Sequence, residues 1–221
     1  HVMAMAVQQL FPNARVTIGP WTETGFYYDF DNPDPFTEAD LKAIKKGMIK
    51  IINQKLPLQR VEVSRAEAET RIKAQNEPYK LEILEGLQEP ITLYTLGEKW
   101  WDLCAGPHVE HTGQLNAKAF ELEGVAGAYW RGDENRQQLQ RIYGTAFETP
   151  EQLSEHKRRI EEAKRRDHRR IGTDLGSAAL LTSNGSPPQI TKSAASPGAI
   201  ILGRPPKISA GKLVIAAIAD S

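Results

Sequence analysis

The chain has 221 residues, of which 40% are hydrophobic and 25% charged, proportions that are ordinary for a globular protein with a sizeable core. Its 28 basic and 28 acidic residues cancel, so any nucleic-acid contact must come from a local patch rather than from the charge of the whole chain. A single cysteine excludes an internal disulfide, and no apolar run is long enough to span a membrane, which together predict a cytoplasmic protein.

The first half of the chain alternates between helical and strand patterns. Thr37 begins a helix through a capping box in which Asp40 stands in for the usual Glu or Gln, and helical spacing then continues to about residue 55. Ser64 begins another helix, directly after an alternating strand at residues 58–63. The other segments predicted here are helices at residues 2–10 and 79–84 and an aromatic-rich strand at residues 25–30.

From residue 91 the pattern changes to strands separated by turn residues such as Gly113 and Gly124. The predicted strands are residues 91–96, 100–104, 117–122, 128–131 and 138–147. Because short turns join them, they predict an antiparallel sheet, and with helices packed against it the fold class is α+β. We assign residues 1–148 to this domain.

A long polar helix is predicted after this domain. Thr149 is its cap, Pro150 takes the first helical position and Gln152 the third. The helix has few apolar residues, which suits an exposed connector. We expect the connector at residues 149–171 and a poorly structured tail at residues 172–221, because that tail has no Phe, Trp or Tyr and is rich in Gly, Ala, Ser and Pro.

The strongest candidate for chemistry is the stretch at residues 102–108, DLCAGPH. It contains Cys104, the only cysteine, and places His108 four positions later across a Gly106-Pro107 turn. A thiol and an imidazole brought together in this way can bind a metal, polarise a water or hold a ligand, and His1 can complete the cluster. A lone cysteine is, with comparable frequency, a small buried hydrophobic residue, so both interpretations stand at this point.

A series of motifs along the chain is jointly specific. They are LFP at residues 10–12, GFYYD at 25–29, PYK at 78–80, DLCAGPHV at 102–109, AGAYWRGD at 126–133 and QRIYGTA at 140–146, with His1 ahead of the first. In this order they resemble the amino-terminal editing domain of bacterial-type threonyl-tRNA synthetases, which is similar to the editing module of alanyl-tRNA synthetases. The resemblance covers residues 1 to about 171.

The resemblance implies hydrolysis of seryl-tRNA(Thr), a mischarged product of the synthetase. It assigns catalysis to five residues: His1, Lys80, Asp102, Cys104 and His108. The two histidines are the expected proton carriers, and the lysine offers a positive charge to the oxyanion or to ribose oxygens. The aspartate orients a neighbour or binds the substrate amine, and the cysteine shapes the pocket, acts as a weak donor or binds a metal.

Tyr28 is the expected substrate-binding residue, lining the adenosine pocket by stacking or hydrogen bonding. The resemblance implies the acceptor end of tRNA(Thr) as partner and no DNA or membrane partner. No cofactor is required by this interpretation, and the sequence leaves the oligomeric state open.

Two departures from the family keep other interpretations open. The family has an H-x3-H pair of which His1 matches only the second histidine, and the match ends before the ATP-dependent aminoacylation core, so we expect no ligase activity from this chain. One alternative is a zinc-dependent hydrolase of the alanyl-tRNA type, with zinc at His1, Cys104 and His108. The other is a fragment that binds tRNA without catalysis.

Overall fold

The structure of this chain is a computed structural model that describes residues 1–181, with side chains through residue 166. Its helices are α1 (Val2–Leu10), α2 (Glu38–Asn53), α3 (Arg65–Ala74), α4 (Pro78–Gly86) and α5 (Pro150–Leu181). Its strands are β1 (Arg15–Val16), β2 (Trp21–Thr22), β3 (Gly25–Asp31), β4 (Leu58–Val63), β5 (Ile91–Leu96), β6 (Trp100–Leu103), β7 (Phe120–Tyr129) and β8 (Gln138–Ala146). Helices combined with antiparallel sheets confirm the predicted α+β class.

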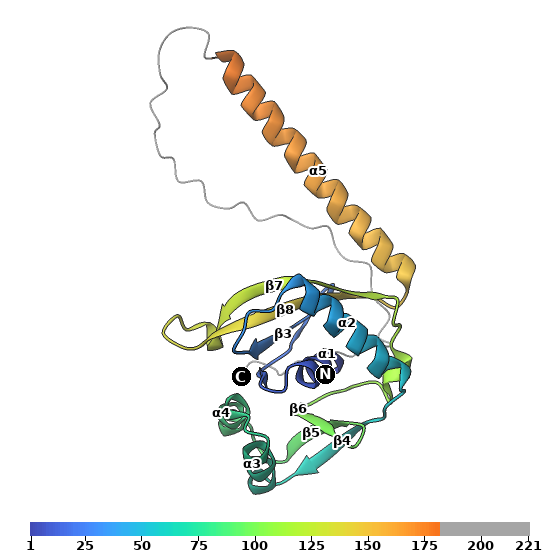
Figure 1. Ribbon diagram of the computed structural model, residues 1–221, viewed down its shortest axis with the longest axis vertical. Coiled ribbons are helices and arrows are strands. Elements are labelled where there is room, and N and C mark those ends of the chain that lie inside the picture. The colour runs from blue at the N-terminus through green and yellow to red at the C-terminus, as the bar shows by residue number, and fades with distance from the viewer. Residues whose placement is uncertain (182–221) are drawn as a thin grey trace. The chain divides into compact units, whose positions relative to one another are not determined.

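The strands of the described residues form two antiparallel sheets rather than the single sheet predicted (Figure 1). The larger sheet has the order β1-β3-β8-β7, with β2 paired to β3, and the smaller has the order β4-β5-β6. The smaller sheet pairs strands that are close in sequence, whereas β3 pairs with the distant β8, so that Tyr28 lies opposite Ile142. Local spacing predicts each strand but not which strands share a sheet.

The segments predicted as separate strands at residues 117–122 and 128–131 both overlap one strand, β7, which begins at Phe120 and ends at Tyr129. Its register with β8 shifts between Leu122 and Gly124. A glycine in this position predicts a turn, yet a glycine inside a strand also accommodates a bulge, which is what the shift records. The β7–β8 hairpin then closes through a short 3-10 turn at Trp130–Gly132.

Helix α1 is buried on nearly every side, as expected of a helix that is apolar all round. Residues 2–7 are all buried. Gly47 of α2 permits close helix packing, because a Cβ there would lie 3.3 Å from the Cβ of Ala6. The two helices and the inner face of the larger sheet enclose the main core, in which Phe30 and Ile142 are fully buried.

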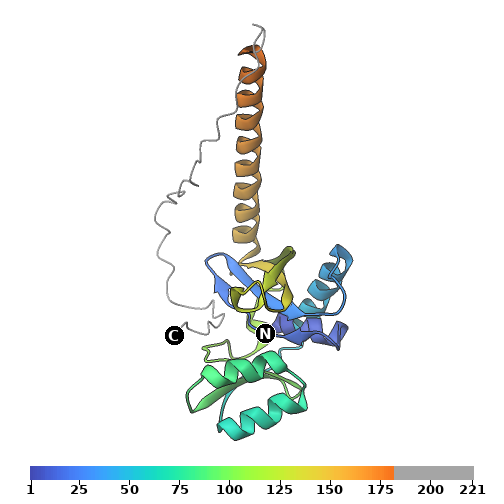
Figure 2. The same cartoon turned by 90° about the vertical axis from the view of Figure 1, so that its left-hand side faces the viewer.

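Helices α3 and α4 lie side by side against the smaller sheet (Figure 2). A second core cluster, which includes Ile72 and Leu93, forms between these helices and the strands. Leu96 of β5 and Trp100 of β6 belong instead to the main core with α1. The edge of the smaller sheet formed by β6 therefore packs near α1.

The chain divides into two compact units. Among the described residues, the first is His1–Leu153 and the second begins at Ser154. Leu153 is buried, so the first turn of α5 belongs to the first unit rather than to the predicted connector. The predicted cap is present, because Thr149 Oγ1 accepts a hydrogen bond from the Gln152 N–H and Gln152 Oε1 accepts one from the Thr149 N–H, both at 3.3 Å.

Helix α5 ends at Leu181, beyond the predicted end at residue 171. The extension contains Ala178, Ala179, Leu180 and Leu181, residues with high helix propensity, which the composition of the tail as a whole obscures. The rest of the predicted tail, residues 182–221, lies outside the described residues. Within residues 1–181 no helix combines the length and the apolar character that crossing a membrane requires.

The capping box of α2 gives a first prediction. Thr37 Oγ1 accepts from the Asp40 N–H at 3.2 Å, and Asp40 Oδ2 accepts from the Thr37 N–H at 2.8 Å. Thr37→Ala should lower the free energy of unfolding by about 1 kcal/mol in urea titrations, because it leaves a helix N–H without a partner. The matched control is Thr70→Ala, at an exposed position inside α3, where alanine should be neutral or slightly stabilising. Equal losses in both variants would contradict the capping role.

Candidate functional site

The centre of the site is the buried carboxylate of Asp102. It lies on β6 opposite Tyr94 of β5 and is 4% exposed. Its Oδ1 lies 2.8 Å from Lys80 Nζ, and its Oδ2 accepts a hydrogen bond from the hydroxyl of Tyr28. The Nε2 atom of His1 lies 3.7 Å from the same Oδ2. One carboxylate thus joins side chains from the smaller sheet, the larger sheet, α4 and the start of α1.

Lys80 projects from the first turns of α4 and is 1% exposed. Besides its ion pair with Asp102, its Nζ lies 5.7 Å from the ring centroid of Trp100 and 5.5 Å from that of Trp101. A buried ammonium is costly unless it is paired, and the faces of aromatic rings add further compensation. The ion pair and the two rings therefore offset the cost of burying this lysine.

Cys104 and His108 meet across the Gly106-Pro107 turn. The Cys104 Sγ lies 3.0 Å from His108 Nε2 and accepts a hydrogen bond from the Gly106 N–H at 3.3 Å. Gly106 has a φ of 74°, and a Cβ there would lie 2.1 Å from the hydroxyl of Tyr94. Only glycine fits this turn, because both the left-handed backbone and the contact exclude a side chain.

Burial raises the pKa of the Cys104 thiol to about 11. The thiol is therefore protonated at neutral pH and can donate to His108 Nε2. A nucleophilic cysteine needs a depressed pKa, so this cysteine is not prepared for covalent catalysis.

His1 completes the cluster, as the sequence predicts. Its ring centroid lies 4.4 Å from that of His108 and 5.5 Å from that of Trp100. Its Nδ1 is buried without a hydrogen-bond partner among the described residues, while its Nε2 faces Asp102. The structure therefore brings all five candidate catalytic residues together, and their roles stay predictions.

Tyr28 also lies in this group, but its ring is enclosed. A Cβ on Gly19 would lie 2.1 Å from the ring, and Phe30 stacks on it with centroids 5.2 Å apart. Burial, followed by the adjacent Asp102, raises the pKa of this phenol well above its usual value, so it acts as a donor. The enclosed ring leaves little room for a base to stack on it, and the role of Tyr28 in substrate binding stays a prediction.

Sequence reasoning missed a second buried carboxylate. Glu77, 3% exposed, accepts from Gln8 Nε2 at 2.6 Å and from the Val16 N–H at 3.0 Å, and Gln8 Oε1 in turn accepts from Trp100 Nε1 at 2.7 Å. The available signal was Gln8, which with Gln9 is one of two polar residues in a helix that is otherwise apolar. Glu77 itself gives no signal, since a glutamate before Pro78 is typical of any exposed helix start.

The outer side of α4 is tied to the tip of the β7–β8 hairpin. Glu82 accepts two hydrogen bonds from Arg136, at 2.7 and 2.6 Å, and one from Trp130 Nε1 at 2.9 Å. The Nε atom of Arg131 lies 3.1 Å from Oε1 of the same carboxylate. The backbone of Arg131 has a φ of 54°. The AGAYWRGD motif thus holds the helix that carries Lys80.

The side chains of His1, Cys104 and His108 could also hold a metal ion, because their ligand atoms all lie within 4.8 Å of one another. Two imidazoles and one thiolate fit zinc by chemical type. The observed 3.0 Å between Cys104 Sγ and His108 Nε2 is shorter than the roughly 3.6 Å expected across a tetrahedral zinc, so zinc binding would have to move them apart.

Comparison with known proteins identifies relatives of this chain. Residues 91–143 match the family described as the threonyl and alanyl tRNA synthetase second additional domain. The chain is 89% identical to threonine–tRNA ligase of Parasynechococcus marenigrum over 175 residues, which are 79% of the chain and 29% of that protein. It is 71% identical to threonine–tRNA ligase of a Synechocystis species over 176 residues, again 29% of the relative. The resemblance predicted from the motifs is confirmed, for a chain that spans less than a third of the length of these relatives.

The tie between Glu82 and the hairpin gives a prediction with a defined pH dependence. The hydrogen bonds from Arg136 lower the pKa of Glu82 from 4.5 to about 2. A carboxylate whose pKa is lower in the folded state stabilises the protein fully above its unfolded pKa and loses that contribution as pH falls through the folded value. Glu82→Gln should therefore lower the free energy of unfolding by about 1 kcal/mol at pH 7, and the difference from the unmodified chain should shrink between pH 4.5 and 2.

Urea unfolding at several pH values would measure this. The matched control is Glu85→Gln, an exposed position on the same helix. A difference for Glu82→Gln that stays constant with pH would show that the lost charge is not responsible.

Proposed function

We propose that this chain, which shares its sequence with the part of threonyl-tRNA synthetase that contains the second additional domain, hydrolyses the ester of seryl-tRNA(Thr). The observation that supports this most is the convergence of two imidazoles and a neutral thiol on a buried lysine–aspartate pair. A pocket built for threonine rejects serine by only about 1–3 kcal/mol, the value of one methyl group, so a separate hydrolytic site has a clear use.

In the proposed mechanism a water oxygen attacks the ester carbonyl carbon. An imidazole accepts the water proton as the new C–O bond forms, and the proton then passes to the departing ribose oxygen as its bond to the carbonyl carbon breaks. His1 is suited to the first step because its Nδ1 has no hydrogen-bond partner among the described residues and Asp102 faces its other nitrogen. His108 is the second candidate carrier.

Lys80 supplies positive charge for the negative oxygen that develops during attack. Its position is set in advance by Asp102, so little reorganisation accompanies the reaction. The protonated Cys104 acts as a donor within the pocket, which makes direct attack by water, rather than a covalent acyl-enzyme, the route that its pKa supports. The acceptor end of tRNA(Thr) is the proposed partner, with the Tyr28 hydroxyl on the pocket wall.

Single-turnover deacylation of seryl-tRNA(Thr), with protein in excess, tests this function. His108→Ala should slow hydrolysis by roughly 100- to 10,000-fold, the usual contribution of a general acid or base. The control His156→Ala replaces a histidine of α5 in the second unit and should leave the rate unchanged. Binding of tRNA with no hydrolysis above background would overturn the proposal in favour of the non-catalytic alternative.

The zinc-dependent alternative rests on the arrangement of His1, Cys104 and His108. A zinc ion held there would lower the pKa of a bound water and so generate hydroxide. Elemental analysis of the purified chain separates the two mechanisms. We expect far less than one zinc per chain and hydrolysis that resists chelators, because the neutral thiol would first have to lose its proton. Stoichiometric zinc, lost together with activity in Cys104→Ser, would establish the alternative.

A further inference from the structure

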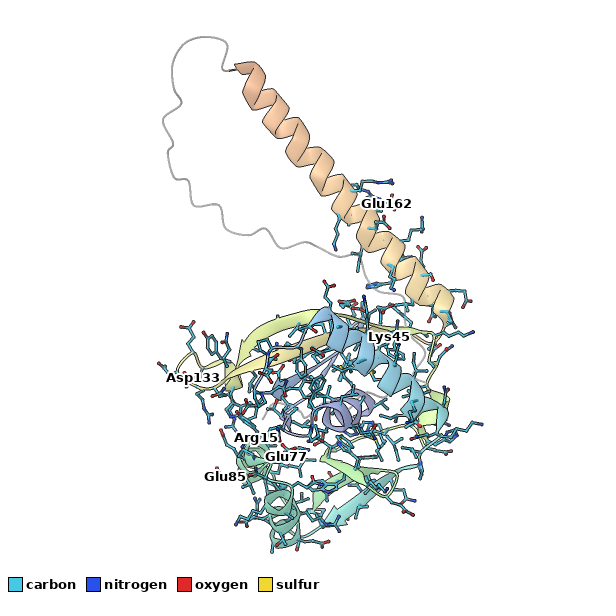
Figure 3. The ribbon with its side chains drawn as sticks, in the orientation of Figure 1. Arg15, Lys45, Glu77, Glu85, Asp133 and Glu162 are labelled. Atoms are coloured by element: carbon cyan, nitrogen blue, oxygen red, sulfur yellow. The ribbon has the colours of Figure 1, made fainter. Side chains whose placement is uncertain are left out.

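We infer that Glu77 is a positioning residue of this site. Its Oε1 holds α1, which begins directly after His1, through Gln8, and its Oε2 holds β1 at Val16, so that both are fixed relative to the helix that carries Lys80. The expected effect on the rate of hydrolysis rests on the proposed editing function, whereas the expected effect on how firmly α1 is held does not. In Figure 3, Glu77 lies between α4 and α1.

The groups around Glu77 are all hydrogen-bond donors, so its carboxylate can only accept. The indole N–H of Trp100 can only donate, and it donates to Gln8 Oε1 at 2.7 Å, which turns the amide nitrogen of Gln8 toward Glu77 Oε1 at 2.6 Å. The backbone N–H of Val16 can also only donate, and it reaches Glu77 Oε2 at 3.0 Å. Both oxygens must therefore accept, which is the property of an ionised carboxylate and not of an amide or a protonated acid.

This chain of hydrogen bonds connects the elements that carry the candidate catalytic groups. Gln8 lies on α1, which begins directly after His1, and Trp100 lies on β6 two residues before Asp102. Glu77 immediately precedes α4, three residues before Lys80. The network therefore links the same three elements that meet at Asp102, at a second place in the fold.

A polar network of this kind is not needed for stability alone, since well-packed apolar side chains often serve a buried interface as well as charged ones do. What the network adds is direction, because each of its hydrogen bonds allows one arrangement of donor and acceptor. A displacement of 1 Å between reacting groups can cost about 100-fold in rate, so an orienting contact of this kind has a measurable effect.

The test is Glu77→Gln, which preserves shape and removes the charge. The new amide must direct its nitrogen at either Gln8 Nε2 or the Val16 N–H, both of which are donors, so one hydrogen bond is lost. With saturating protein, the single-turnover rate constant should fall about 10- to 100-fold, while the protein concentration at half-saturation changes little. The matched control Glu85→Gln, on an exposed part of the same helix, should change neither quantity.

A double variant distinguishes positioning from general damage. Combining Glu77→Gln with Gln8→Glu exchanges the carboxylate and the amide between the two positions. The carboxylate at position 8 then accepts from the Trp100 indole N–H and from the amide N–H at position 77. The amide oxygen at position 77 accepts from the Val16 N–H. This exchange should restore the rate constant to within a few-fold of the original. If Glu77→Gln does not fold, recovery of both folding and rate in the exchanged pair carries the same evidence.

A second readout is independent of catalysis, because Cys104 is the only cysteine. Loosening of α1 should increase the rate at which a thiol reagent modifies this buried side chain in Glu77→Gln, and the exchanged pair should reverse the increase. If the unmodified chain shows no deacylation while these labelling rates change as expected, the proposed function fails and the positioning role stands. Labelling in Glu77→Gln that equals that in Glu85→Gln, or an exchanged pair without recovery, would overturn the inference.

Discussion

The rest of the site depends on one constraint, the burial of the ion pair between Lys80 and Asp102. Removing two charges from water costs several kcal/mol for each ion, and their mutual attraction offsets that cost only when the remaining donors and acceptors are also satisfied. Here the second oxygen of Asp102 accepts from Tyr28, and the lysine lies over two tryptophan rings. Losing either partner would leave an unpaired buried charge, a change that typically destabilises a protein by about 3–5 kcal/mol. Chemistry and stability are therefore linked at this pair.

The groups around this pair come from both sheets of the first unit. Asp102 comes from the smaller sheet and Tyr28 from the larger one, while His1 precedes the buried helix α1. Each core cluster stabilises its own sheet, and Trp100 joins the smaller sheet to the main core. Polar contacts at Asp102 then determine how these parts meet, since hydrogen bonds have direction and apolar packing alone does not. A site assembled in this way is sensitive to small shifts of α1 or α4.

Sequence reasoning recovered what local patterns encode. The capping box at Thr37 and the strands β4 and β5 follow from neighbouring residues, and the structure confirms them. Lys80 was found only through a family resemblance, because nothing in the spacing distinguishes it from an exposed lysine. Glu77 was missed because its partner Gln8 is 69 positions away, and no periodicity connects residues at such a separation. The division of the strands into two sheets was not predicted for the same reason, since strand pairing across the whole domain is not a local property.

The ionisable side chains of the pocket bear on the choice between the two proposed mechanisms. Lys80 and Asp102 form its buried ion pair, and Glu77 accepts hydrogen bonds at both of its carboxylate oxygens. The two proposed occupants are an aminoacyl ester and a divalent metal. A metal would also require the Cys104 proton to leave, although burial raises the pKa of that thiol to about 11. Attack of water on an aminoacyl ester needs no such loss, and this difference supports the proposed hydrolysis over the zinc-dependent alternative.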